Sequence, residues 1–173
     1  MIQTHEIHER FPELKWIENK TLRNQVAEVW ATAANKGKWT NLDDVPFTLL
    51  IENSGRLVDH TRRITVLAWN VGNTREEPLN KDYLIAGAIL HDVGKLLEYE
   101  IVDGKAVKSE FGKRYRHPVS GSNLAKELGL PEEIVHIIYA HSKEGDTIQR
   151  SPEAIIVNHC DFIDFEIKKA LVK

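Results

Sequence analysis

The sequence predicts an all-α helical bundle with one small β-hairpin. Apolar residues recur at helical spacing along most of the 173 residues, in segments that begin near Ser, Thr or Pro and end at Gly. The period changes only around Asp103-Gly104, where two short alternating runs flank a dipeptide typical of two-residue hairpins. Hydrophobic residues make up 42% and charged residues 28%, as expected of one globular domain.

The helices expected before the hairpin cover residues 21–37, 46–72 and 81–95. Thr21 is the expected N-cap of the first helix, and Gly37 ends it. Pro46 suits the first position of the second helix, which continues to Gly72. Because the second helix is the longest of the three, we expect it to be the central one.

The helices expected after the hairpin cover residues 118–129, 131–139 and the stretch from 151 onward, with a loop at 143–149. Pro118 and Pro131 suit first helical positions, and Gly129 suits a C-terminal stop. Ser151-Pro152-Glu153 combines a cap, a first-position proline and an acidic residue at the positive end of a helix dipole.

Composition and charge exclude several classes of protein. The net charge of −3 argues against a nucleic-acid partner. Cys160, the only cysteine, can form neither an intramolecular disulfide nor a cysteine zinc cage, and we expect it to be a small buried residue. No apolar run approaches the ~18 residues of a membrane span, and the N-terminus lacks the apolar core of a signal peptide. We therefore expect a cytoplasmic protein with no membrane partner.

His91-Asp92 is the main candidate for chemistry. It ends an apolar run, where a histidine and an aspartate are costly to bury unless they bind something. Four more residues of metal-binding type precede or follow it on or beside predicted helices: His60, His117, His141 and Asp161. Imidazole and carboxylate ligands suit iron, manganese, zinc, cobalt or nickel, and the two oxygens of Asp92 can bridge two ions. Two ions ~3.5–4 Å apart can activate a water and clamp a phosphoester.

This order of residues resembles the HD-domain superfamily of metal-dependent phosphohydrolases. The residues 59–64 (Asp-His-Thr-Arg-Arg-Ile) look like its first motif, 90–95 (Leu-His-Asp-Val-Gly-Lys) like its signature, and Asp161 with Ile163-Asp164 like its last. The resemblance implies an HD-domain helical bundle over residues 45–173. Residues 1–44 are then expected to be an N-terminal helical extension that packs on this core.

The resemblance also implies two sets of metal ligands and a hydrolytic mechanism. One divalent ion would bind His60, His91, Asp92 and Asp161, and a second Asp92, His117 and His141, with iron or manganese favoured and zinc, nickel, cobalt and magnesium as alternatives. A metal-activated water would attack the phosphorus of a nucleotide or another small phosphate ester. Asp92 and Lys95 are the expected catalytic residues, and Lys95, Arg63 and Arg116 would contact the substrate.

Several alternatives follow from the same residues. Ser142 stands where cyclic-dinucleotide phosphodiesterases of this superfamily have a second histidine, which argues against that substrate class. A di-iron oxygenase would use almost the same ligands, and a non-catalytic sensor or interaction module could retain the fold.

His159 and His136 are expected to be structural. Tryptophans clustered in the first forty residues could cover one end of the bundle or meet a partner, so a homodimer stays open.

Overall fold

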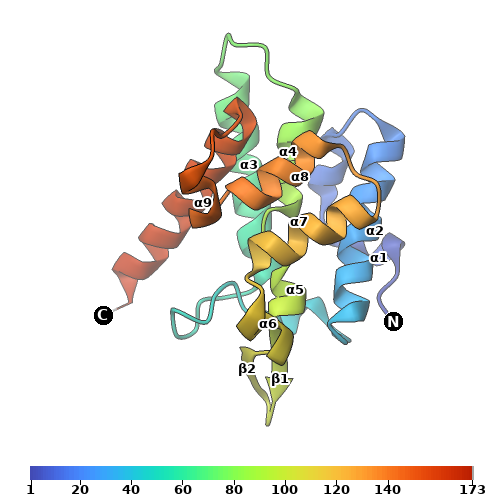
Figure 1. Ribbon diagram of the computed structural model, residues 1–173, viewed down its shortest axis with the longest axis vertical. Coiled ribbons are helices and arrows are strands. Elements are labelled where there is room, and N and C mark those ends of the chain that lie inside the picture. Colours follow the sequence, from blue (N-terminus) through green and yellow to red (C-terminus); the bar gives the residue numbers. More distant parts are fainter. Residues whose placement is uncertain (173) are drawn as a thin grey trace.

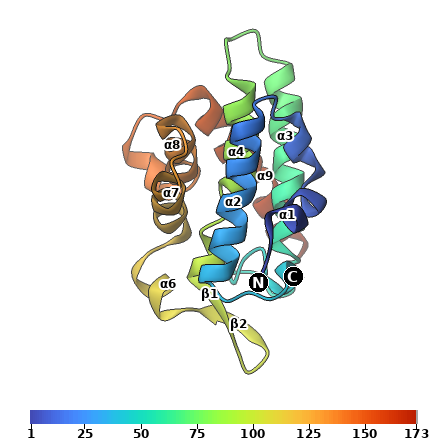
Figure 2. The same cartoon turned by 90° about the vertical axis from the view of Figure 1, so that its right-hand side faces the viewer.

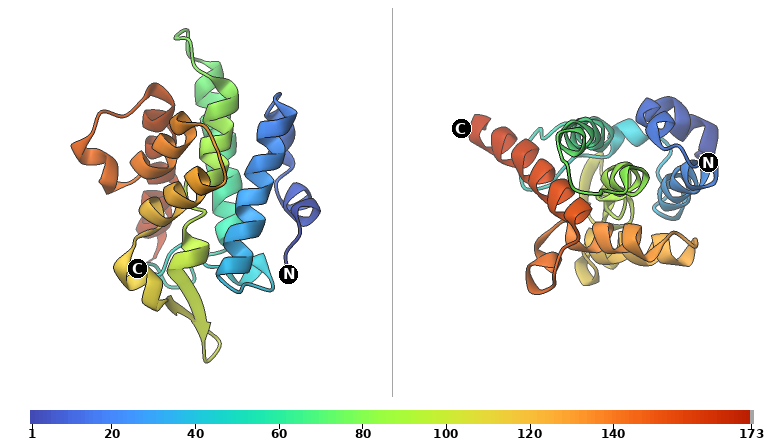
Figure 3. Two further views of the ribbon diagram at one scale, coloured as in Figure 1. Left: turned by 45° about the vertical axis from the view of Figure 1, so that its right-hand side comes forward. Right: turned by 90° about the horizontal axis from the view of Figure 1, so that it is seen from above.

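The computed structural model describes residues 1–172 and confirms an all-α bundle with one two-stranded sheet. The helices form three groups (Figure 3): α1 (Thr4–Arg10) and α2 (Lys20–Lys36) on one side, α3 (Leu57–Asn73) and α4 (Lys81–Leu90) in the middle, and α7 (His117–Glu127), α8 (Glu132–Ala140) and α9 (Pro152–Leu171) on the other. Over this described range, no helix is both long and apolar enough to cross a membrane.

The central helix is α4, not α3 as the sequence suggested. The helices α2, α3, α8 and α9 all pack against α4, and every residue from Leu84 to Leu90 is buried. A helix surrounded on all sides needs apolar residues on every face, which the uninterrupted run from Leu84 to Leu90 supplies. This run, and not the length of the helix, is the sequence signal of the central helix.

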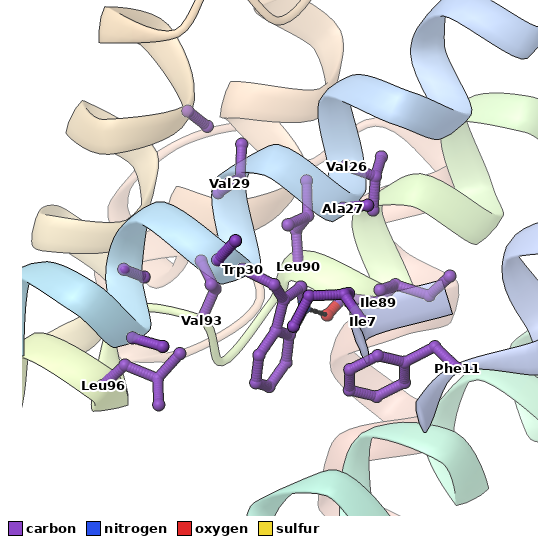
Figure 4. Close-up of a cluster of buried hydrophobic side chains, with 14 of the residues drawn as sticks. Ile7, Phe11, Val26, Ala27, Val29, Trp30, Ile89, Leu90, Val93 and Leu96 are labelled. Atoms are coloured by element: carbon purple, nitrogen blue, oxygen red, sulfur yellow. Dashed lines mark hydrogen bonds between the residues drawn. The ribbon is translucent and has the colours of Figure 1, made fainter. Parts of the chain in front are cut away.

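The N-terminal helices pack on the segment that carries His91-Asp92. Figure 4 shows Trp30 of α2 at the centre of this packing, against Phe11 at a centroid distance of 4.7 Å. The Trp30 indole N–H donates to the carbonyl of Ile89 at 2.9 Å, and the Trp39 indole donates to Leu96 at 2.8 Å. These two tryptophans therefore anchor both sides of the 91–94 turn. The domain boundary at residue 45 stays a prediction.

The start of the first predicted helix needs a correction, and two earlier elements were missed. The N-cap of α2 is Asn19, whose side chain accepts the Leu22 N–H at 3.1 Å, and Thr21 lies inside the helix. The short helix α1 and the 3-10 helix η1 (Pro12–Trp16) precede it.

The prediction that the second helix begins near Pro46 is wrong. The helix α3 begins at Leu57, and a 3-10 turn η2 (Leu42–Asp44) leads into an irregular segment at 46–56. This segment folds back on itself, with a bridge between Pro46 and Arg56 and a hydrogen bond from Phe47 N to Gly55 O at 2.8 Å. Gly55 has φ +94°, which ends helical continuity, although the apolar residues ahead of it fit a helical spacing.

The third predicted helix is interrupted at His91. The helix α4 ends at Leu90, and residues 91–94 form a tight turn with bonds from Val93 N to Leu90 O and from Lys95 N to Asp92 O. A short helix α5 (Lys95–Glu98) follows. Gly94 makes the turn possible, because a Cβ there would lie 2.1 Å from the carbonyl oxygen of His117. The turn thus brings His91-Asp92 close to the start of α7.

The predicted hairpin is confirmed. The strands β1 (Tyr99–Val102) and β2 (Lys105–Lys108) pair antiparallel, with Tyr99 opposite Lys108 and Val102 opposite Lys105. Asp103 and Gly104 have φ of 51° and 75°, as a type I′ turn requires. The hairpin projects from one end of the bundle (Figure 1).

The later helices lie close to their predicted positions. The helix α7 begins one residue before Pro118, and Ser151 caps α9 by accepting the Ala154 N–H at 3.2 Å. Two short elements were not predicted: α6 (Glu110–Arg114) and the 3-10 turn η3 (Lys143–Thr147), which lies in the expected loop. Figure 2 shows α7 and α8 beside each other on the face of α4 away from α3.

Candidate metal centre

The six predicted metal ligands come together although they belong to five different helices or their ends. They are His60 in α3, His91 and Asp92 in the turn after α4, His117 at the start of α7, His141 just after α8, and Asp161 in α9. All are buried except Asp161, whose side chain is 17% exposed. The role of each residue as a metal ligand stays a prediction.

The side chains form two groups that share Asp92. Its Oδ2 lies 3.4 Å from the Nε2 atoms of His60 and His91, and His60 Nε2 lies 3.1 Å from Asp161 Oδ1. Its Oδ1 lies 3.2 Å from His117 Nε2 and 3.5 Å from His141 Nε2. Ligand atoms about 2.1 Å from a common ion stand about 3.0–3.4 Å apart in octahedral or tetrahedral geometry. Most of these spacings are those of ligands already gathered around an ion.

Each histidine is held so that Nε2 faces the centre. The Nδ1 atoms of His91 and His141 lie 2.7 and 2.6 Å from the carbonyl oxygens of Ala88 and Ile138. A carbonyl oxygen only accepts hydrogen bonds, so Nδ1 carries the proton and Nε2 presents a lone pair.

Carboxylates hold the other two histidines. Asp164 Oδ2 lies 2.7 Å from His60 Nδ1, and Glu98 Oε2 lies 2.7 Å from His117 Nδ1 and accepts the His117 backbone N–H at 2.8 Å. An acidic or carbonyl partner on the outer nitrogen is the usual support of a metal-binding histidine.

The inward-facing nitrogen and oxygen atoms suit a bound cation better than they suit hydrogen bonds with one another. Among residues 1–172, Asp92 Oδ1 and His141 Nε2 are buried side-chain atoms with no hydrogen-bond partner. His60 Nε2 and His91 Nε2 lie 3.2 Å apart. A buried acceptor without a donor is costly, and a positive ion between these atoms removes that cost.

The protonation states also favour metal binding at most of these groups. Burial opposes ionisation of Asp92, but Lys95 and His91 outweigh it and hold its pKa well below the usual value. Burial lowers the pKa of His117 to about 4, so its imidazole is neutral near pH 7. Burial also lowers the pKa of His60, but hydrogen bonds with Asp161, Asp164 and Asp92 prevail and raise it to about 9. A metal ion bound at His60 would take the place of the proton that His60 carries near pH 7.

Glu98 and Asp164 are functional candidates whose roles were not predicted from the sequence. Glu98 is 3% exposed, and burial would raise its pKa, but hydrogen bonds from His117 lower it to about 2. Asp164 lies one turn after Asp161 in α9, and this spacing was a usable signal for a residue at the same site. Glu98 carried no such signal, because only the fold brings the end of α5 to His117.

The three predicted substrate contacts have different surroundings. Lys95 is 6% exposed, and its Nζ lies 2.5 Å from Asp92 Oδ2 and 2.8 Å from the Phe47 carbonyl. Arg116 borders the cavity beside the site and pairs with Glu144. Arg63 is outside the set of residues that line this cavity, and its guanidinium makes two hydrogen bonds to Asp164, at 2.6 and 2.8 Å.

The other titratable residues singled out in the sequence are not members of the two ligand groups. His159 is exposed, and His136 accepts the Ser151 N–H at 3.1 Å, as a structural histidine would. Cys160 is 2% exposed, and burial raises its pKa to about 11, in keeping with a small buried residue.

A cavity of about 420 Å³ opens onto the site. Asp92, Lys95, His117 and Asp161 all contribute to its wall. This volume lies in the range of small-molecule sites, roughly 300–1,000 Å³.

Fold and site together define a helical protein with a buried histidine–aspartate centre suited to divalent metal ions. The model of the HD domain family matches residues 57–166, and the chain belongs to this family. Residues 1–56 lie outside the match.

Named relatives within this family act on phosphoesters. The chain is 30% identical to a dihydroneopterin 2′,3′-cyclic phosphate phosphodiesterase of Methanocaldococcus jannaschii. The alignment spans 125 residues, which are 69% of this chain and 50% of the relative. The chain is 29% identical over 105 residues to ribonuclease Y of Thermotoga petrophila, over 61% of this chain and 18% of the relative. It is 36% identical over 77 residues to ribonuclease Y of Acidothermus cellulolyticus, over 44% of this chain and 13% of the relative.

The chain thus spans half or less of the length of these relatives. No solved structure matches it significantly.

Proposed function

We propose that this protein is a metal-dependent phosphohydrolase that acts on a nucleotide or another small phosphate ester. The observation that carries the proposal is the Asp92 carboxylate, which turns one oxygen to each of two groups of histidine and aspartate ligands. The names of the relatives, a cyclic phosphate phosphodiesterase and a ribonuclease, support the same type of bond cleavage. The cavity of about 420 Å³ favours a small molecule over a polymer.

In this proposal the chain holds two divalent ions, with iron or manganese first and zinc, nickel, cobalt or magnesium as alternatives. His60, His91 and Asp161 would hold one ion, His117 and His141 the other, and Asp92 would bridge them. Two such ions supply Lewis acidity that lowers the pKa of a water and offsets phosphate charge.

The protein's own groups orient this site. Lys95 is a positive charge at the cavity wall, and its bond to the Phe47 carbonyl holds Nζ beside Asp92. We propose that Lys95 fixes the bridging carboxylate and offers its remaining proton to a phosphate oxygen. Arg116 would assist at the cavity wall. The bonds of Arg63 to Asp164 favour a different role from the predicted one, in which Arg63 positions Asp164 and through it His60.

The experiment is a phosphoester screen of the metal-loaded protein without oxygen. Protein loaded with Mn²⁺ or Fe²⁺ is assayed against nucleoside monophosphates, 2′,3′-cyclic nucleotides and bis(p-nitrophenyl) phosphate. We expect hydrolysis of at least one of them, and loss of that activity in Asp92→Ala. The same screen is repeated in air with the iron-loaded protein, and turnover that appears only there would instead favour the oxygenase alternative. Full metal loading with no hydrolysis would favour a non-catalytic module.

Location and assembly remain predictions. We propose a cytoplasmic protein with neither a membrane nor a nucleic-acid partner, and we keep the homodimer as a hypothesis to be tested by the mass of the protein in solution.

A further inference from the structure

The cavity beside the metal centre has a wall of large apolar side chains. Two parts of the chain build it: Phe47, Leu49 and Leu50 from the 46–56 segment, and Phe162 and Phe165 from α9. The views agree that these two parts lie on the same side of the molecule (Figure 1 and Figure 3), and Phe47 meets Phe165 edge-on at a centroid distance of 6.2 Å. This wall adjoins the first group of metal ligands, because Phe47 stacks on His60 at 3.7 Å and Phe162 follows Asp161.

Two members of the wall expose much apolar surface. Leu50 is 82% exposed and Phe162 is 45% exposed. Among the large hydrophobic residues of the described chain, only Met1 is more exposed than Leu50. Phe47, by contrast, is 1% exposed and forms the floor. Exposure of apolar side chains to water is unfavourable in free energy. A bound apolar group that covers them removes this cost.

The charged groups of the same cavity offer a ligand less binding free energy, because most of them already have an ion-pair partner. Lys108 pairs with Glu98 at 3.1 Å, Arg116 pairs with Glu144, and Lys95 pairs with Asp92. Lys143 is exposed, where a lysine stays hydrated whether or not a ligand is present. The apolar wall is therefore the part of the cavity that should discriminate among phosphate esters with different organic groups.

From this wall we infer the chemical class of the substrate, an inference that rests on the proposed function. The structure assigns the site to a phosphate ester whose organic group carries a flat ring. The phosphate would lie beside Lys95 and the ions that Asp92 would hold, and the ring would lie against Phe162 and Leu50. Phe162 and Leu50 are then specificity-determining residues. An aromatic ring suits this wall because an aromatic pair adds stabilisation beyond the buried area alone.

The test measures binding of two phosphonates that differ only in the organic group. Phenylphosphonate and methylphosphonate are titrated calorimetrically into the Mn²⁺-loaded protein, and neither contains a P–O–C bond to hydrolyse. We expect the wild type to bind phenylphosphonate roughly 10-fold more tightly. Phe162→Ala should weaken phenylphosphonate roughly 3- to 10-fold and leave methylphosphonate unchanged. Leu50→Ala, in the 46–56 segment of the same wall, should act in the same direction.

Ile163→Ala is the matched control. Ile163 is the next residue of α9 and is similarly exposed at 48%, but it is not among the cavity-lining residues. It should leave both affinities unchanged, and because these side chains are exposed, the variants should fold as the wild type does.

The outcomes separate this inference from the proposed function. Equal affinity of the wild type for both phosphonates, or equal losses for both in Phe162→Ala, would overturn the ring site while leaving phosphate binding intact. Failure of the wild type to bind either phosphonate would overturn the phosphohydrolase proposal together with the ring site.

Discussion

At the scale of single residues, the site depends on which atoms face inward. Four histidines present Nε2 to the centre because carbonyl or carboxylate oxygens hold their Nδ1 atoms at 2.6–2.7 Å. Among residues 1–172, Asp92 is the one residue that faces both groups of candidate ligands. Substitutions at these positions should therefore act on particular ions and not on the whole fold.

We expect Asp92→Ala to lose both ions and to lose activity to background, because both proposed ion sites share its carboxylate. His141→Ala should lose mainly the second ion. Metal content per chain, measured by mass spectrometry, checks both. Asp59→Ala, which removes an acidic residue adjacent to His60 that pairs with Arg56, is the control and should keep full metal content. Full occupancy in Asp92→Ala would refute the bridging role.

Substitutions of Glu98 and Asp164 should each weaken a different one of the two proposed ions. Glu98→Gln removes the charge that supports His117, and Asp164→Asn removes the charge that supports His60. Loss of such a partner typically costs 10- to 100-fold in metal affinity. In calorimetric titrations with Mn²⁺, we expect Glu98→Gln to weaken the second ion and Asp164→Asn the first, each by roughly that factor. Unchanged titrations for both variants would show that these carboxylates have no positioning role.

At the scale of elements, the 91–94 turn is the joint on which the site depends. It changes the direction of the chain between α4 and α5, and it packs Gly94 against the first turn of α7. Trp30 and Trp39 hold the chain on either side of it through bonds to Ile89 and Leu96. The spacing between Asp92 and His117 is therefore set by contact between backbones, which leaves no room for a side chain.

Gly94→Ala should damage both stability and metal binding. Its Cβ would lie 2.1 Å from the His117 carbonyl oxygen and would push the turn away from α7. We expect a loss of at least about 1–3 kcal/mol in the free energy of unfolding, measured by urea denaturation, and weaker binding of the second ion. Gly104→Ala is the control, because a Cβ there meets nothing within 4 Å. It should cost about 1 kcal/mol from its positive φ and should leave metal affinity unchanged. Equal metal affinities for Gly94→Ala and wild type would contradict this account of the turn.

At the scale of the whole molecule, five helices converge on a cluster of ionisable groups. Without metal ions, a proton on His60 offsets the charge of Asp92, Asp161 and Asp164. The stability of the metal-free protein should therefore depend on pH.

The pKa of His60 rises from about 6.5 in the unfolded chain to about 9 in the folded protein. Its contribution to stability is thus present in full below about pH 6.5 and lost as the pH rises through 9, by about 3 kcal/mol. His117 acts in the opposite window: its pKa is lowered to about 4, so stability is lost as the pH falls from about 6.5 toward 4. The metal-free protein should be most stable near pH 6.5.

Urea unfolding of chelator-treated protein at pH 5, 6.5 and 9 measures this profile. His60→Gln should remove the decline between pH 6.5 and 9. A flat profile in the wild type over that range would show that the His60 proton does not stabilise the fold. Excess Mn²⁺ should restore stability at pH 9, because the ion then takes the place of the proton.

Much of the fold could be predicted because its signals are local. The Asp-Gly hairpin, the Ser151 cap of α9 and the proline near the start of α7 each depend on a few neighbouring residues. The errors arose where distant packing prevailed. The 46–56 segment has apolar residues at helical spacing, but Phe47 and Leu50 serve a cavity instead of a helix face. The apolar run of α4 is typical of a buried helix, but which four helices surround it depends on packing between distant segments.

The residue types and order of the candidate metal centre could be predicted from the chain alone, because imidazoles and carboxylates at helix positions are costly to bury without a ligand. The sequence could not identify the partners of those residues. That Glu98 supports His117, that Arg63 binds Asp164, and that Phe162 and Leu50 open onto one cavity depends on segments far apart in the chain meeting in space. Those choices belong to the tertiary structure, since hydrogen bonds and apolar contacts require proximity that no spacing along the chain can guarantee.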